Sequence, residues 1–185
     1  MTREEALNSI KANVENGNLI KHMLATEAIM RVLAKHLGEG EDEEEWGLAG
    51  LLHDIDMELT QGNMHTHSKL GADLARELGA NEAVVHAILY HNEAHGIPRE
   101  TKLDEALFCV DPLTGLITAA ALVRPDKKLA SLEVKSVIKK FKQKGFAAGV
   151  NRQQIAQCSE IEIEFDQFIE LGLMAMQAIA ADLGL

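Results

Sequence analysis

Apolar side chains recur at helical spacing along almost the whole chain, and no segment shows the strict alternation of a half-buried strand. Asn18 and Asn81 are the expected N-caps of two helices, Gly38 is expected to end one, and the longest helix could be interrupted at Pro112. The spacing predicts a loop over 54–65 and helices over 2–15, 19–37, 42–53, 67–78, 82–94, 102–123, 131–144, 151–158 and 162–183. With aromatic residues at only 4% and three prolines, the pattern predicts an all-α fold.

The size and charge of the chain narrow the class of protein. Its 185 residues, 46% of them hydrophobic, suffice for one core, and no repeat or linker divides them, so we expect a single domain over 1–185. The 18 Lys and Arg against 29 Asp and Glu give a net charge of −11, which argues against binding a nucleic-acid polymer. Two cysteines, a polar N-terminus and a longest apolar run of only Gly115–Val123 predict a cytoplasmic protein without a membrane segment.

Charged residues gather in two places. Residues 39–45 hold six acids, and residues 127–144 hold seven lysines against the single acid Glu133. Each cluster is typical of a solvated helix surface. The lysine cluster could also attract an anionic ligand or partner, and both interpretations stay open from the sequence.

A set of histidines and aspartates points to a metal site. His53 and Asp54 stand side by side where an apolar helix opens into a polar loop, and an imidazole next to a carboxylate suits a divalent transition metal. Asp111 lies inside a strongly apolar segment, where a carboxylate is costly to bury unless it is paired or binds a cation. Further candidate ligands on other helices are His22, His67 and His91.

The other histidines are less favoured as ligands. His65 competes with His67, two residues away, and His95 shares a helix face with His91, where it would support the site or face solvent. We expect structural roles for His36 and His86.

Five segments carry a resemblance to a known family: LIKHMLATEAIMR, GLLHDID, HSKLGADLARELG, AVVHAILYHNEAHG and ALFCVDPLTGL. With them, residues 18–125 resemble the HD-domain superfamily of metal-dependent phosphohydrolases, and more narrowly its HDIG-type subset. The resemblance implies a multi-helix HD-domain bundle on which the helices of 126–185 pack. It implies a primary metal site formed by His22, His53, Asp54 and Asp111, and a second ion held by His67 and His91 with Asp54 as the bridge. The ions could be Fe, Mn, Co, Ni, Zn or Mg.

The sequence departs from the HDIG pattern at three places. Asp56 stands where the motif has glycine, and Met57 and Glu58 follow where relatives often have a lysine. Asn92 stands where some relatives carry a second histidine. A phosphate contact that relatives have near the motif is therefore missing or replaced.

The chemistry implied is hydrolysis of a small phosphoester, a nucleotide or a related metabolite, by metal-activated water. The enzyme would be a phosphomonoesterase or phosphodiesterase with Asp54 as its catalytic residue. Candidate cations for the substrate phosphate are Arg124, Lys21 and Lys144. Two alternatives remain: a di-iron oxygenase similar to inositol oxygenase, and a non-catalytic metal-binding signalling domain. The oligomeric state is left open.

Overall fold

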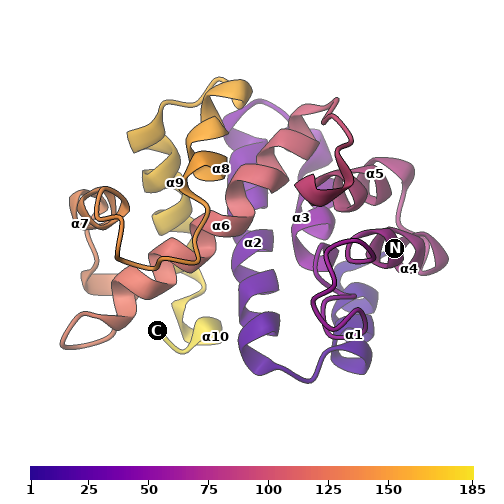
Figure 1. Ribbon diagram of the computed structural model, residues 1–185, viewed down its shortest axis with the longest axis horizontal. Coiled ribbons are helices and arrows are strands. Elements are labelled where there is room, and N and C mark those ends of the chain that lie inside the picture. Colours follow the sequence, from indigo (N-terminus) through magenta and orange to yellow (C-terminus); the bar gives the residue numbers. More distant parts are fainter.

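The computed structural model describes residues 1–185 except for the side chain of Glu41. The described residues form ten α-helices and four short 3₁₀ helices without a strand, which confirms the predicted all-α fold (Figure 1). The α-helices are α1 (Arg3–Asn13), α2 (Gly17–His36), α3 (Glu43–Leu52), α4 (Lys69–Glu77), α5 (Glu82–Tyr90), α6 (Lys102–Leu122), α7 (Val134–Phe141), α8 (Arg152–Ala156), α9 (Phe165–Ala178) and α10 (Ala180–Leu183). The 3₁₀ helices are η1 (Gly40–Asp42), η2 (Glu93–His95), η3 (Leu129–Ser131) and η4 (Gln157–Ile161).

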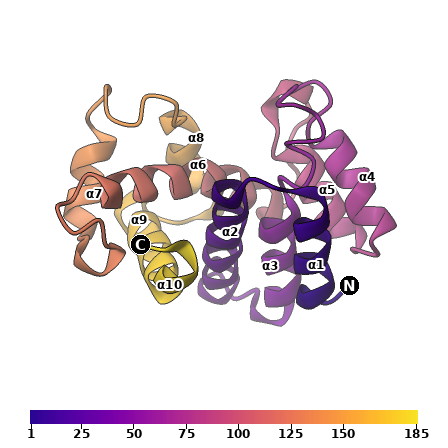
Figure 2. The same ribbon diagram turned by 90° about the horizontal axis from the view of Figure 1, so that it is seen from below.

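Helix α2 lies in the middle of the fold. In both ribbon views α1, α3, α4 and α5 lie on one side of it and α7, α9 and α10 on the other, while α6 crosses the molecule (Figures 1 and 2). Helix α2 packs against α3, α6 and α9, and α6 also packs against α7 and α8. The buried side chains between these helices include Ile29, Leu33, Leu107 and Leu113. The helices after residue 125 therefore cover the two longest helices of the fold.

Helix caps explain where several elements begin and end. Asn81 caps α5 as predicted, because its side chain accepts a hydrogen bond from the Val84 N–H at 3.0 Å. The prediction of Asn18 as a cap was wrong. The cap is Asn16, whose side chain accepts from the N–H of Asn18 at 2.9 Å, so α2 begins two residues earlier than predicted. Gly38, with φ of +82°, follows the last turn of α2 as predicted.

Pro112 does not interrupt α6, which contradicts the interruption considered at this position. A proline lacks the N–H that would bond to the carbonyl four residues earlier, here that of Phe108. The side chain of Gln154 in α8 fills the gap, because its Nε2 donates to the Phe108 carbonyl at 2.6 Å. The helix therefore continues through the segment that carries Asp111.

Other boundaries also differ from the prediction. Helix α5 ends at Tyr90 rather than 94, and α7 covers Val134–Phe141 rather than 131–144. Helix α4 begins at Lys69 rather than 67, because Ser68 has a left-handed backbone with φ of +67°. The helix predicted over 162–183 is two helices, α9 and α10, separated at Ile179, whose backbone leaves the α conformation.

One described helix, α6, is long and apolar enough to cross a membrane by length and composition. Its most apolar stretch is 61% buried inside the fold, and a buried core helix passes the same test.

Candidate metal centre

The structure brings all six predicted ligands to one place. His22 comes from α2, His53 and His91 are the C-cap residues of α3 and α5, and Asp111 comes from α6. The imidazole rings follow one another around Asp54, with centroids 4.9 Å apart for His22 and His53 and 5.2 Å apart for the next two neighbouring pairs. Two groups of three residues have ligand atoms within 4.8 Å of one another: His22, His53 and Asp54, and Asp54, His67 and His91.

Asp54 faces both groups, one with each carboxylate oxygen. Its Oδ2 lies 3.4 Å from Nε2 of His22 and 3.5 Å from Nε2 of His53. Its Oδ1 lies 3.4 Å from Nε2 of His67 and 3.8 Å from Nε2 of His91. A carboxylate in this position suits a bridge between two cations.

The C-cap histidines are held by their own helices. Nδ1 of His53 donates to the carbonyl of Gly50 at 2.8 Å, and Nδ1 of His91 donates to the carbonyl of Ile88 at 2.6 Å. These carbonyls belong to the last helical turn, which has no backbone partner for them. A proton on Nδ1 leaves the lone pair on Nε2, so both rings present an acceptor to the centre.

The other two histidines have side-chain partners at Nδ1. The Thr114 hydroxyl donates to the Asp111 carbonyl at 2.9 Å, so its oxygen accepts from Nδ1 of His22 at 2.7 Å. Nδ1 of His67 donates to Oδ1 of Asp56 at 2.8 Å. Both rings therefore also direct an Nε2 lone pair inward. Four imidazole acceptors and two carboxylates fit divalent cations, which accept nitrogen and oxygen ligands together.

The electrostatics of the centre favour a positive charge on His22 and a neutral ring on His53. Burial alone would lower the pKa of His22, but hydrogen bonds and charge attraction from Asp111 and Asp54 raise it to about 10. Burial lowers the pKa of His53 to about 4. His22 and His53 nevertheless place their Nε2 atoms 3.0 Å apart, with Oδ1 of Asp111 3.2 Å from the former. The Nε2 proton of His22 satisfies these acceptors, and a bound cation would take the place of that proton.

Two supporting residues were missed from the sequence. Asp56 is fully buried and anchors His67, although its only visible signal was that it replaces the glycine of the motif. Thr114 anchors His22, and its signal was its position one helical turn after Asp111. Metal ligands in proteins are commonly oriented in this way through the second ring nitrogen.

The loop that carries His67 is fastened by the residues after His91. Nδ2 of Asn92 donates to the carbonyls of Met64 at 2.8 Å and His67 at 3.1 Å. Nε2 of His95 lies 2.8 Å from the same His67 carbonyl, which agrees with the predicted supporting role.

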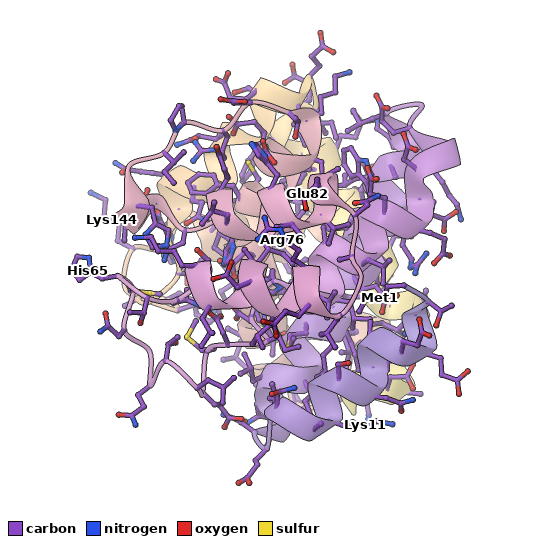
Figure 3. All side chains as sticks on the ribbon, turned by 90° about the vertical axis from the view of Figure 1, so that its right-hand side faces the viewer. Met1, Lys11, His65, Arg76, Glu82 and Lys144 are labelled. Carbon is purple, nitrogen blue, oxygen red and sulfur yellow. The ribbon has the colours of Figure 1, made fainter. Side chains whose placement is uncertain are left out.

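The remaining histidines lie away from the centre. His65 is exposed, and Figure 3 shows it at the outer edge of the fold. His36 is also exposed, and Nδ1 of His86 lies 3.0 Å from Oδ1 of the buried Asp104. In the same view Arg76 and Glu82, whose side chains are 3.0 Å apart, join α4 to α5.

A cavity of 410 Å³ opens at the centre and is lined by four of the six predicted ligands: Asp54, His67, His91 and Asp111. The rest of its lining includes Met57, Met64, Asn92, Glu93 and Gln154, and no Lys or Arg among the described residues. Gln154 lines it while bonded to Phe108, so α8 contributes one wall.

The three predicted phosphate-binding cations do not line this cavity. Lys21 lines a second cavity of 450 Å³, which His22 also lines. Nε of Arg124 donates to Ser131 at 2.8 Å and lies 3.6 Å from Asp126. Lys144 lines neither cavity. Contact of these cations with a substrate stays a prediction.

Comparison with known proteins places the chain in a family. The HD domain matches residues 19–135, a range that contains all six predicted ligands. The chain is 33% identical over 116 residues to ribonuclease Y of Lawsonia intracellularis, covering 63% of this chain and 20% of that protein. It is 29% identical over 140 residues to ribonuclease Y of a Sulfurovum species, covering 74% of this chain and 26% of that protein.

The match to these relatives is partial in length. The chain also aligns with ribonuclease Y of Oleidesulfovibrio alaskensis, at 32% identity over 98 residues, which is 53% of this chain and 18% of that protein. It thus spans about a fifth to a quarter of the curated relatives it matches. No solved structure shows a significant match. The ordered His and Asp set, the all-helical fold and the family match together show that this chain belongs to the HD-domain family.

Proposed function

We propose that this protein is a metal-dependent phosphohydrolase that cleaves a small phosphoester, a nucleotide or a related metabolite. The observation that carries the proposal is Asp54, whose two oxygens face two separate sets of imidazole acceptors. The first ion would be held by His22, His53, Asp54 and Asp111, and the second by His67, His91 and Asp54. Two such ions supply a nucleophilic water at neutral pH and neutralise charge on the phosphoryl oxygens.

The protein groups around the ions have separate tasks in this proposal. Asp54 holds the two groups of ligands at a fixed spacing and orients the attacking water through its oxygens. The side chain of Asp111 is 32% exposed and reaches the cavity, where it can bind water beside the ester. Met57 and Met64 form an apolar wall that the organic part of the substrate can contact.

The volume and the lining of the cavity favour a small substrate over a polymer. A volume of 410 Å³ is at the lower end of the usual range for small-molecule sites. A polymer would bring flanking phosphates, which proteins normally meet with Lys and Arg, and none lines this cavity among the described residues. RNA is nevertheless the second candidate substrate, because the relatives are named ribonuclease Y.

The test uses the full chain loaded separately with Mn²⁺, Co²⁺, Ni²⁺ or Fe²⁺. The substrates are p-nitrophenyl phosphate, its bis ester, the nucleoside monophosphates and a single-stranded RNA. We expect cleavage of at least one small ester. We also expect Asp54→Ala to reduce that rate by about a hundredfold or more, because it removes the shared ligand. The matched control is Asp73→Asn on the exposed surface of α4, which should cleave at the wild-type rate.

The outcomes separate the candidate functions. A protein that holds two ions and cleaves none of the esters contradicts the proposal. Cleavage of the RNA alone would favour the activity for which the relatives are named. Oxygen uptake by the iron-loaded protein with a cyclic polyol, without ester cleavage, would favour the oxygenase alternative. A stable protein partner together with bound metal and no turnover would favour a signalling domain.

A further inference from the structure

One buried carboxylate beside the centre is not used by the proposed reaction. Asp56 is 0% exposed and accepts three hydrogen bonds, each 2.8 Å long. Its Oδ1 accepts from Nδ1 of His67, and its Oδ2 accepts from the backbone N–H groups of Ser68 and Gly71. Burying a carboxylate is costly unless such donors surround it. The three donors around Asp56 therefore favour a carboxylate at this position.

Asp56 performs the capping that α4 lacks. The residue at the cap position, Ser68, makes no side-chain bond to the helix, and its hydroxyl donates to the carbonyl of Leu89 at 3.1 Å. The first N–H groups of a helix need acceptors, and a negative charge there is favourable. Asp56 supplies both the acceptor and the negative charge, from a segment outside the helix.

A glycine on α4 leaves room for this carboxylate. A Cβ added to Gly71 would lie 3.1 Å from both Cγ and Oδ1 of Asp56, closer than ordinary contact. The aspartate at 56 and the absence of a side chain at 71 therefore fit one another. A glycine at 56, as in the HDIG pattern, would leave Nδ1 of His67 and two backbone N–H groups without this acceptor.

We propose that Asp56 is a positioning residue for the second metal ion, acting through His67. By accepting from Nδ1 it fixes the proton on that nitrogen and turns Nε2 toward Oδ1 of Asp54. By capping α4 it also fixes the backbone next to His67. The inference rests on the proposed function, because it assigns the second ion to His67, His91 and Asp54.

The variant Asp56→Asn disturbs the proposed positioning whichever way its amide is turned. It keeps the size of the side chain but has one acceptor oxygen and one NH₂ group. If the oxygen faces α4, the NH₂ points at Nδ1 of His67, which must then accept, and the ring proton moves to Nε2. If the oxygen faces His67, the NH₂ meets the N–H groups of Ser68 and Gly71, and the cap is lost. In either case the lone pair or the position of Nε2 changes.

The experiment counts and titrates metal in the full chain, using Mn²⁺ or Co²⁺ as the probe. We expect two ions per wild-type chain and one per chain for His67→Ala. For Asp56→Asn we expect binding of the second ion to weaken by about 10- to 100-fold, with the first ion retained. Asp73→Asn on the same helix should keep both ions at wild-type affinity. Imidazole NMR of the zinc-loaded protein should show His67 bound through Nε2 in the wild type and this signal lost in Asp56→Asn.

A second, milder variant keeps the inference testable if Asp56→Asn fails to fold. Gly71→Ala keeps the carboxylate but displaces it by a few tenths of an ångström, and should weaken the second ion in the same direction by a smaller factor. Retention of both ions at wild-type affinity in Asp56→Asn, or a wild-type chain that binds a single ion, would overturn the inference. Failure of the proposed function looks different: the wild type binds two ions, loses one in Asp56→Asn, and cleaves no ester.

Discussion

The candidate metal centre has a packed half, with His22, His53 and Asp111, and a loop half, with His67 and His91. The two halves are built in different ways. His22 and Asp111 come from α2 and α6, the two longest helices, which pack against each other and let Thr114 of α6 anchor the His22 ring. His67 comes from a loop, and it is oriented by a buried carboxylate and by the polar side chains of Asn92 and His95. In the packed half, the side chain of His22 is 23% exposed and that of Asp111 is 32% exposed. In the loop half, the side chains of His67 and His91 are only 2% and 3% exposed.

The difference shows where each kind of support is useful. Long packed helices hold ligands in place while leaving one side open to the solvent or a substrate. A loop cannot do this alone, because its backbone has few packed neighbours, so its ligand needs a full set of hydrogen bonds. Removing a hydrogen bond that supports α6 should therefore lower the stability of the whole fold, and removing one that holds the His67 loop should loosen that loop alone.

The largest expected effect comes from the residue that both halves share. Asp54→Ala should retain neither ion, because it removes one ligand oxygen from each half, whereas His67→Ala should retain the ion of the packed half. Elemental analysis of the desalted protein gives both counts. An Asp54→Ala protein that keeps an ion would show that the halves do not depend on a common carboxylate.

The next effect concerns the packed half. Gln154→Leu leaves the Phe108 carbonyl beside Pro112 without a donor, and an unpaired buried carbonyl costs about 1–3 kcal/mol. Urea denaturation should show this loss in the free energy of unfolding, for the metal-free protein as well. The control is Gln143→Leu at an exposed position, which should stay within about 0.5 kcal/mol of wild type. Equal stability of the two variants would mean that α6 tolerates the open carbonyl.

The smallest effect concerns the loop half. Asn92→Ala removes two hydrogen bonds to the carbonyls of Met64 and His67, at a cost of about 1–2 kcal/mol. Hydrogen exchange followed by mass spectrometry should show faster exchange in residues 63–68, while α2 and α3 exchange as in the wild type. Faster exchange across the whole chain would argue that the loop is not a separate unit of stability.

The sequence predicted which segments are helical better than it predicted their caps and the contacts between helices. Helical spacing located the helices, and the cap at Asn81 could be read because its partner Val84 is three residues away. The cap of α2 was misplaced because Asn16 and Asn18 both precede the helix and only the structure shows which one accepts from the backbone. The continuity of α6 was not predictable, since Gln154 lies 46 residues from the carbonyl that it binds.

The same limit applies to the candidate site. The six predicted ligands were identified by their order and by the family resemblance, and the structure places them together. The anchors of these ligands were not identified. Asp56 and Thr114 make contacts that depend on how helices meet. Their places in the sequence, at the glycine of the motif and one turn after Asp111, do not by themselves indicate which histidine they bind.

The bond between Gln154 and Phe108 also has a consequence for the order of events during synthesis. Phe108 is synthesised 46 residues before Gln154, so its carbonyl has no side-chain donor until α8 has been added to the chain. The wall of the cavity that Gln154 of α8 contributes is therefore synthesised after every segment that carries a predicted ligand.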